Sequence, residues 1–307
     1  MRHVLVPGLL ESPPVGVEGV EYPRFPALET RLARADTISA PPGLDAALLS
    51  IFQLEQTMPV APLCWLGETG DFSSEWLLQA TPVHFRADRD RLLLFQLDDG
   101  QLNQQQAEVF VALFNQHFAE DGLSLKVASA LRWYLFCTKP VRSRFMPLSE
   151  VVGRSLAEFM PEGEDAHFWR GVINETQMLF FQHQEMQESS LPVSGLWFSG
   201  AGKLSQRAGI APGECDGDYC LLSGLQKMAL ETDNSQSVHV IEEVQLALGT
   251  QDGSAWQGAM ERVEKKIQYL SGASDELVIY PGGRIAYHWR DSMKYRFWRK
   301  KKPLDKF

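Results

Sequence analysis

Residues 191–203, with the sequence LPVSGLWFSGAGK, constrain the fold of this chain more than any other segment. Leu196, Trp197 and Phe198 form a short apolar run typical of a buried strand, and four small residues follow it before Lys203. Glycine tolerates positive φ and the close approach of another backbone, and consecutive amides in a glycine-rich turn can hold an anion. The segment therefore predicts a buried strand that ends either in a phosphate-binding turn or in an ordinary structural turn.

The spacing of this segment excludes the standard nucleotide-binding motifs. A P-loop requires a glycine, four residues, and then Gly-Lys-Ser/Thr. With Gly202 and Lys203 as the closing pair, the first glycine position falls at Trp197, and Leu204 stands where the hydroxyl is required. The dinucleotide fingerprint fails as well, because Ser205 occupies its third glycine position. Spacing alone favours a structural turn.

Composition limits the classes to which the chain can belong. Its 307 residues, 44% of them hydrophobic, suffice for one large domain or two smaller ones. The net charge is −10, but the segment from Arg290 to the end carries eight basic and two acidic residues, which gives +6 there and −16 elsewhere. Four cysteines in a chain of this length do not indicate a disulfide framework. We find no secretory signal and no segment of membrane-spanning length in the sequence, and we expect a cytoplasmic protein.

Hydrophobic patterning predicts alternating strands and helices. The expected strands lie at residues 3–6, 63–66, 83–88, 91–97, 123–127, 131–137, 191–198, 276–280 and 285–289. The expected helices lie at residues 26–35, 43–54, 73–79, 104–118, 165–188 and 254–270. The pattern of residues 83–137 predicts a strand–strand–helix–strand–strand unit. We expect a discontinuous α/β core domain (1–80 and 165–307), an inserted α+β domain (81–164) and a basic tail (290–307).

The middle of the chain contains, in order, a strand, an acidic turn, a helix and two strands, at residues 83–88 (VHFRAD), 97–100 (LDDG), 106–117 and 122–137. This order resembles the inserted domain of the cofactor-independent phosphoglycerate mutases of the archaeal type. The resemblance continues through the glycines of residues 152–163, a long helix, and the strand that leads into Gly200–Gly202. It covers roughly residues 83–203. The chain as a whole is most similar to a bacterial offshoot of that family that includes RpfE-type regulatory proteins.

The resemblance implies an alkaline-phosphatase-like core, that is, a mixed, mostly parallel sheet flanked by helices, with a small α+β domain inserted. It also implies two divalent metals, such as Mn or Zn, held by Asp and His, and a Ser or Thr nucleophile that takes the phosphoryl group. Such metals polarise the phosphate and lower the pKa of the nucleophile, so the chemistry depends on their ligands.

The positions that match the metal ligands of this family lack most of them. The first strand ends in Pro7-Gly8 where the family has Asp-Gly. His239 is the one credible histidine of the late motif, and residues 279–283 (IYPGG) contain neither acid nor histidine. His183 matches the first residue of a His-Pro-Val-Asn motif whose other residues are absent. We therefore expect no metal cofactor, with His183 and His239 as weak metal candidates.

The candidate anion-binding residues follow from the glycine turn and the resemblance. Gly200, Gly202 and Lys203 supply the turn, and Arg86 and Arg154 are the arginines expected to contribute. The expected ligand is a small phosphorylated or anionic molecule. A structural turn and a salt-bridge network remain the alternatives for these residues.

The basic tail alternates cations with Tyr295, Phe297 and Trp298. Such a segment can stack on bases or meet an anionic surface. The alternative is that its charges are solvated or that it docks on the acidic remainder of the same chain.

Three interpretations of function remain, one of which is a protein that uses its basic tail on nucleic acid or a membrane. The other two concern the resemblance to the mutases. The first is a catalytically degenerate, phosphoglycerate-mutase-like protein that acts as a binding or regulatory protein, with a small ligand or a protein partner. The second is an active metal-dependent phosphoglycerate mutase or phosphomonoesterase with non-standard ligands. No catalytic residue can be assigned from the sequence.

Overall fold

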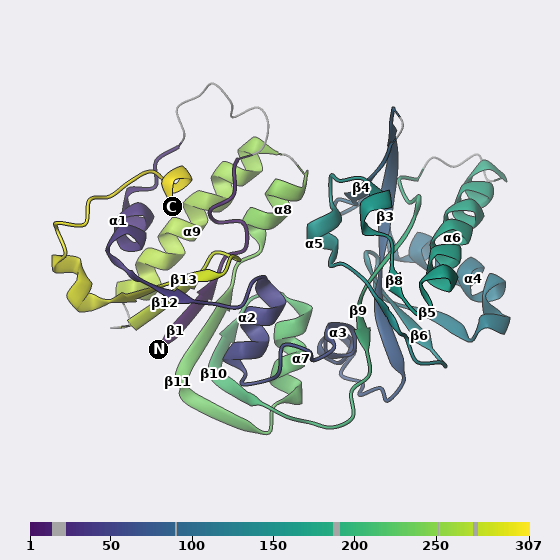
Figure 1. Cartoon of the computed structure of the whole chain (residues 1–307), viewed down its shortest axis with the longest axis horizontal. Helices are drawn as coiled ribbons and strands as arrows, with labels where there is room; N and C mark the ends of the chain where they lie inside the picture. The colour runs from purple at the N-terminus through teal and green to yellow at the C-terminus, as the bar shows by residue number, and fades with distance from the viewer. Residues whose placement is uncertain (14–22, 90, 187–190, 251, 273–275) are drawn as a thin grey trace. The chain divides into compact units, whose positions relative to one another are not determined.

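The computed structural model describes residues 1–13, 23–89, 91–186, 191–250, 252–272 and 276–307. The chain forms two compact units (Figure 1). Unit 1 combines Met1–Thr57 with Arg207–Phe307, and unit 2 is the continuous segment Met58–Gln206. Unit 2 thus extends beyond the expected insertion of 81–164 at both ends, because the strands that flank that insertion pair with each other.

Unit 1 contains a six-stranded sheet within the described residues, in the order β10-β11-β1-β12-β13-β2. Its strands are β1 (Arg2–Leu5), β2 (Asp36–Ser39), β10 (Ile210–Asp216), β11 (Glu231–Val240), β12 (Glu276–Tyr280) and β13 (Ile285–Arg290). The first four strands in this order are parallel, and β13 pairs antiparallel with both β12 and β2. The expected α/β class with a mixed, mostly parallel sheet is therefore confirmed.

Helices cover both faces of this sheet. The helices of unit 1 are α1 (Pro26–Arg34), α2 (Leu44–Ile51), α7 (Cys220–Met228), α8 (Glu243–Thr250) and α9 (Gly253–Gly272), with short 3-10 turns at Asp291–Tyr295 and Leu304–Lys306. Successive residues of a strand point to opposite faces. Val4 belongs to the core formed with α1, α8 and α9, and the next residue, Leu5, lies against residues of α2. The Oε1 atom of Glu264 on α9 accepts hydrogen bonds from the amides of Ala27 (2.7 Å) and Leu28 (3.2 Å), which satisfies the first turn of α1.

Unit 2 contains a second sheet in the order β4-β3-β6-β5, with β9 paired to β3 as well. Its strands are β3 (Trp76–Asp88), β4 (Arg91–Gln96), β5 (Leu123–Ser129), β6 (Arg132–Cys137) and β9 (Gly195–Gly202), and β7 (Ser143–Arg144) pairs with β8 (Glu162–Gly163). The helices are α3 (Val60–Thr69), α4 (Gln104–His117), α5 (Leu148–Val151) and α6 (Ala166–Met186), with 3-10 turns at Ala119–Asp121 and Leu156–Phe159.

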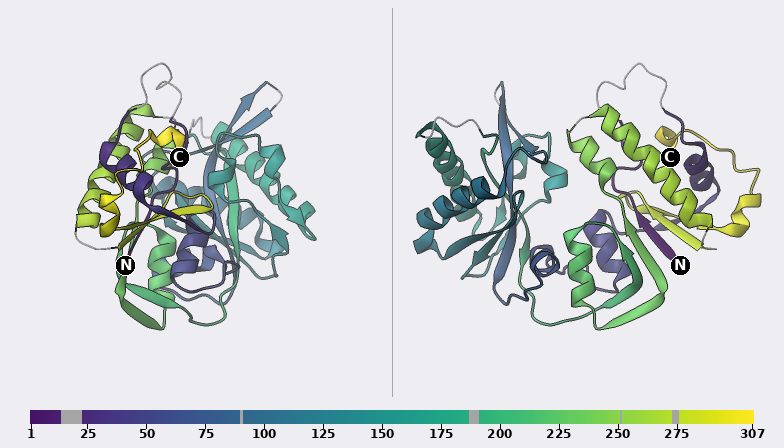
Figure 2. Two further views of the ribbon diagram at one scale, coloured as in Figure 1. Left: turned by 60° about the vertical axis from the view of Figure 1, so that its left-hand side comes forward. Right: turned by 180° about the vertical axis from the view of Figure 1, so that it is seen from behind.

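The two faces of this sheet pack against different helices. Helices α4 and α6 lie side by side (Figure 2), and their Phe110 and Phe180 rings are 4.7 Å apart. On the opposite face, Trp65 of α3 contacts Tyr134 and Phe136 of β6 edge-on, with ring centroids 5.4 and 5.1 Å away. The strand predicted at 191–198 is therefore a strand of unit 2, buried between helices on both faces.

Two local predictions are wrong. Residues 63–66, expected as a strand, lie inside α3, which ends at Gly70 in the left-handed conformation that favours glycine. Residues 73–79, expected as a helix, run into β3, because Leu77 and Leu78 pair with β6. In both cases a short apolar run without clear periodicity fits a helix and a strand equally well. The predicted long helix begins at Ala166, and its predicted end at 188 lies outside the described residues.

Candidate functional site

The residues of the predicted anion turn form part of a strand. Strand β9 continues through Gly202, and Gly200 has φ = +65°. A Cβ atom at Gly202 would lie 2.2 Å from Cβ of Pro59, and one at Gly200 would lie 3.0 Å from the amide nitrogen of Ala61. The two glycines thus allow the start of α3 to pack directly on β9, which explains their presence without a ligand.

Lys203 and Arg86 lie far apart within unit 2. Gly202 pairs with Leu77 of β3, and Arg86 lies nine residues further along the same strand. At about 3.3 Å per residue, this separation is roughly 30 Å. Arg86 is exposed, and its guanidinium carbon lies 4.2 Å from the ring centroid of Phe95. The structure therefore does not bring the two cations together around one ion.

Arg154 lies near the Arg86 end of the sheet. Its backbone oxygen accepts a hydrogen bond from Leu94 of β4 (3.3 Å), and its guanidinium lies 4.3 Å from the ring of Phe159 and 4.0 Å from the carboxylate of Glu158. The side chain is more than half exposed. An anion contact at Gly200, Gly202, Lys203, Arg86 or Arg154 remains a prediction.

The two histidines proposed as metal candidates belong to different units. His183 lies on α6 in unit 2, where its ring meets Phe110 edge-on at 5.9 Å. His239 lies on β11 in unit 1, with 2% of its surface exposed. Each histidine therefore contacts residues of its own unit.

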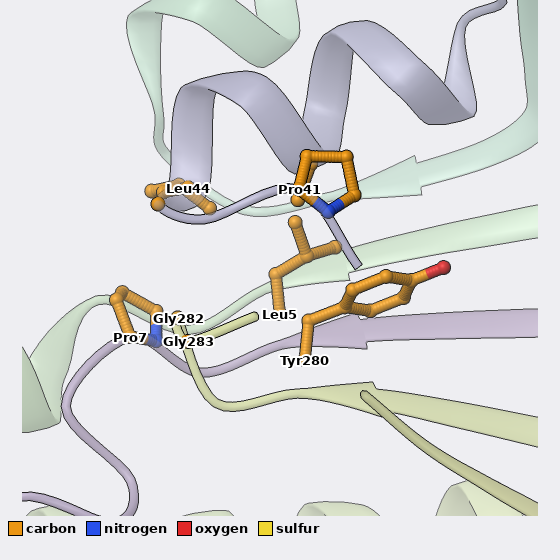
Figure 3. A pocket seen from close by; sticks show the side chains of 9 residues that line it. Leu5, Pro7, Pro41, Leu44, Tyr280, Gly282 and Gly283 are labelled. Carbon is orange, nitrogen blue, oxygen red and sulfur yellow. The ribbon is translucent and has the colours of Figure 1, made fainter. Parts of the chain in front are cut away.

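The carboxyl ends of the parallel strands in unit 1 surround a small pocket (Figure 3). Ligands of open α/β sheets bind at this edge. The lining consists of apolar side chains and glycines: Leu5, Pro7, Pro41, Gly43, Leu44, Ala47, Tyr280, Gly282 and Gly283. Figure 3 shows the Tyr280 hydroxyl directed away from Pro7 and Gly282. The pocket wall formed by these side chains is apolar.

The Tyr280 hydroxyl instead hydrogen-bonds within the sheet. It lies 3.1 Å from Nδ1 of His3, and Nε2 of His3 lies 3.1 Å from Oε1 of Gln236. Burial lowers the pKa of His3 to about 4 and raises the pKa of Tyr280 to about 12. Both side chains are therefore neutral at pH 7, and they contribute hydrogen bonds rather than charge.

A second polar group lies at the ends of β10 and β11. Nδ1 of His239 lies 3.2 Å from Oδ2 of Asp216, and Nζ of Lys266 on α9 lies 2.8 Å from the same oxygen. Nε2 of His239 lies 3.4 Å from Oγ of Ser237. The hydrogen bond from Lys266, followed by that from His239, holds the pKa of Asp216 below its usual value. The carboxylate is thus neutralised by an ammonium group.

These residues do not fit a pair of divalent metals. Two metals require several carboxylate and imidazole ligands converging on one point. The described residues contain no group of three or more His, Cys, Asp or Glu side chains that can hold a metal ion. Next to His239, the single carboxylate of Asp216 is shared with an ammonium that would repel a cation. We therefore derive no reaction step through a metal.

One pair near the pocket is absent from the sequence predictions. Asp45, in the first turn of α2 and next to the pocket residue Leu44, accepts a hydrogen bond from the hydroxyl of Tyr219. Burial raises the pKa of this carboxyl group. An acidic residue that follows Pro-Pro-Gly at the start of a helix can be recognised from the local sequence. Its partner Tyr219 cannot, because it lies 174 residues away in the chain.

No family profile and no curated protein matches the sequence. Among solved structures, the chain is similar to the PH0037 protein from Pyrococcus horikoshii, with 12% identity, a TM-score of 0.50, and coverage of 94% of this chain and 87% of that chain. It is also similar to a cofactor-independent phosphoglycerate mutase from Thermoplasma acidophilum, with 13% identity, a TM-score of 0.42, and coverage of 94% and 89%. At these identities the similarity concerns the fold alone. In the part of the chain that the structure describes, no helix has the length and apolar character to cross a membrane.

Proposed function

We propose that this chain is a binding or regulatory protein built on a phosphoglycerate-mutase-like fold that has lost two-metal phosphoryl transfer. Its core would be of the alkaline-phosphatase type. The chain would belong to the RpfE-type regulatory offshoot of the phosphoglycerate mutase family. The observation that carries this proposal is the composition of the strand-end pocket in unit 1. Where a metal enzyme needs oxygen and nitrogen ligands, the chain has Leu5, Pro7 and Tyr280 together with glycines.

The chemistry of these side chains argues against phosphoryl transfer. Hydroxylated or carboxylated side chains that attack or bind a phosphoryl group need a low pKa or an adjacent base. The Tyr280 hydroxyl has a raised pKa of about 12, and its hydrogen-bonded neighbour His3 is a weak base, because burial lowers the pKa of His3 to about 4.

The ligand we propose is a small phosphorylated or anionic molecule. We propose that Lys203, Gly200 and Gly202 form one contact with this ligand. Arg86 and Arg154 would form another. Lys203 directly follows β9, whose Gly202 pairs with Leu77 at one end of β3, and Arg86 lies near the other end of β3. The two cations would therefore serve two separate contacts. A protein partner is the alternative for the same regulatory role.

Turnover and metal content together test this proposal. The purified protein would be assayed for interconversion of 3- and 2-phosphoglycerate with Mn²⁺ present, and its metal content would be measured by elemental analysis. We expect neither turnover nor stoichiometric metal. Turnover that depends on Mn²⁺ or Zn²⁺ would instead establish an active mutase or phosphomonoesterase with non-standard ligands. In that case His239 and Asp216 would be the first ligands to replace.

A further inference from the structure

The C-terminal segment carries an exposed cluster of aromatic and cationic side chains. We call it the aromatic–lysine patch, and it consists of Tyr295, Phe297, Trp298, Lys300, Lys301 and Lys302. Tyr295 and Trp298 are each 66% exposed, and Phe297 is 79% exposed. Single exposed apolar residues are common on protein surfaces, but three aromatic rings within four residues, next to three lysines, are not.

The segment that carries the patch is fixed to unit 1. Nη1 and Nη2 of Arg296 donate to Oδ1 and Oδ2 of Asp36 at 2.5 and 3.1 Å, and Nη1 of Arg299 donates to the backbone oxygen of Ala35 at 2.6 Å. Met293 and Leu304 on either side are buried. The segment passes over α1 (Figure 1), so the patch is presented from a packed backbone.

The arginines of the segment pair with groups of unit 1, and Lys294 pairs with Asp291 at 2.7 Å. Lys300, Lys301 and Lys302 differ from them, although Lys301 helps to lower the pKa of Glu29. Arg290 pairs with Glu276, and Arg296 and Arg299 pair with Asp36. The described residues provide no hydrogen bond or ion pair to the ammonium groups of Lys300, Lys301 and Lys302, although Lys302 lies 4.4 Å from the Phe307 ring. Arginine is the side chain that grips single phosphates in a bidentate manner, whereas lysine acts as a solvated point charge. The free charge of the patch is therefore suited to a diffuse anionic surface.

The aromatic rings point to the same kind of partner. Phe297 and Trp298 meet edge-on, with an interplanar angle of 81° and centroids 5.4 Å apart, so they do not form a flat platform for successive bases. Tryptophan and tyrosine favour the boundary between lipid headgroups and acyl chains, where one end of the ring is apolar and the other polar. We propose that the aromatic–lysine patch docks unit 1 onto an anionic phospholipid surface, with the rings at the headgroup level and the lysines on the lipid charge.

The charge of the whole chain sets the conditions for this docking. The chain has a net charge of −10, so an anionic surface repels it except near the basic segment. Attraction of the lysines falls off within a Debye length, which is about 10 Å at 0.1 M salt. Docking should therefore be reversible and sensitive to ionic strength.

Vesicle co-sedimentation of the full chain tests the proposal. The probes are phosphatidylcholine vesicles with and without about 30% phosphatidylserine, at low and high salt. We expect binding only to the vesicles that contain phosphatidylserine, weakened at high salt. Replacing Lys300, Lys301 and Lys302 together by Gln should reduce the bound fraction at least about tenfold. The Phe297→Ser, Trp298→Ser variant should also lose binding, because the rings no longer insert.

A matched control uses the same residue types elsewhere on unit 1. Lys265 and Tyr269 are exposed on α9, and the Lys265→Gln, Tyr269→Ser variant should bind like the wild type. Circular dichroism of each variant would establish that it is folded. Equal binding to vesicles without phosphatidylserine, absence of vesicle binding, or binding of a single-stranded oligonucleotide in place of vesicles would each overturn the proposal.

Discussion

Nζ of Lys266 lies 2.8 Å from Oδ2 of Asp216, the same oxygen that lies 3.2 Å from Nδ1 of His239. An ammonium group from α9 thus takes the position next to the carboxylate where a metal would be expected if His239 were a ligand. The arrangement is an ion pair between the end of β10 and the helix that covers one face of the sheet. It stabilises the fold of unit 1 without supplying a reactive group.

Replacing Lys266 by Gln should raise the pKa of Asp216 toward its usual value of 3.8. A lowered pKa in the folded state stabilises the protein above the unfolded pKa, and this stabilisation is lost as the pH falls through the folded pKa. Both side chains are about half exposed or slightly less, so solvent screens the pair, and we expect a loss of about 0.5 kcal/mol at pH 7. Chemical denaturation at pH 7 and pH 3 measures the difference.

The neighbouring Lys265 is exposed and provides the control. Lys265→Gln should leave the free energy of unfolding unchanged at both pH values. A loss at pH 3 as large as that at pH 7 would contradict the assigned ion pair, because stabilisation by a lowered pKa diminishes as the pH falls toward the folded pKa.

Replacing His3 by Gln should flatten the dependence of stability on pH between about pH 6.5 and 4. Burial lowers the pKa of His3 to about 4, whereas the unfolded side chain titrates near 6.5. The unfolded state therefore takes up the proton first, and the wild type should lose stability as the pH falls through this window. A shift of this size corresponds to roughly 3 kcal/mol between pH 7 and pH 4 as an upper limit. Denaturant titrations across this range measure it, and identical slopes for wild type and His3→Gln would show that His3 titrates normally.

Replacing Gly202 by Ala should destabilise the protein. The new Cβ would lie 2.2 Å from Cβ of Pro59, so α3 must move away from β9. We expect a cost of about 2 kcal/mol or more, as for other overpacked sites. The measurement is the free energy of unfolding by denaturant.

Gly171→Ala is the control in the same unit. Gly171 lies inside α6, and the nearest atom to its Cβ position is Oε1 of Glu175 at 3.9 Å. This substitution should stabilise the protein by about 0.5–1 kcal/mol through helix propensity. If Gly202→Ala were as stable as the wild type, the close packing of α3 on β9 would be contradicted.

Lys203 and Arg86 should act independently in any stabilisation by phosphate. Because about 30 Å of strand separates them, they do not share one ion. In thermal shift titrations with inorganic phosphate, the effects of Lys203→Ala and Arg86→Ala should therefore add in the double variant. If either single variant removed the entire shift and the second added nothing, both cations would contact the same ion.

The fold class could be predicted because hydrophobic patterning is local. The alternation of short apolar strands with amphipathic helices indicated an α/β protein, and the helices near 26–35, 104–118 and 254–270 were found at nearly their observed bounds. The mixed, mostly parallel sheet was expected from the family resemblance. Residues 63–66 and 73–79 failed because runs of four to seven residues lack a decisive period. Their state depends on tertiary contacts, such as those of Leu77 and Leu78 with β6.

The surroundings of the glycine strand could not be predicted from the sequence. Glycine spacing favours a structural turn over an anion-binding one but does not show what the glycines pack against. The contact that explains Gly202 is with Cβ of Pro59, 143 positions earlier in the chain. The docking of Arg296 on Asp36 is equally non-local, because the partners are 260 positions apart in the chain. The basic tail was expected either to meet an external anionic partner or to dock on the acidic remainder of the chain. Its arginines Arg296 and Arg299 dock on Asp36 of the same chain.

A Mn²⁺ titration of the purified, chelator-treated protein, followed by electron paramagnetic resonance of the free ion, tests whether this chain binds a pair of divalent metals. The strand-end pocket and the Asp216–Lys266 pair predict that no Mn²⁺ binds with stoichiometric, micromolar affinity. The signal of free Mn²⁺ should therefore rise in proportion to the metal added. Loss of that signal for the first two equivalents per chain would mean that two metal ions bind, which would contradict the proposed loss of the two-metal site.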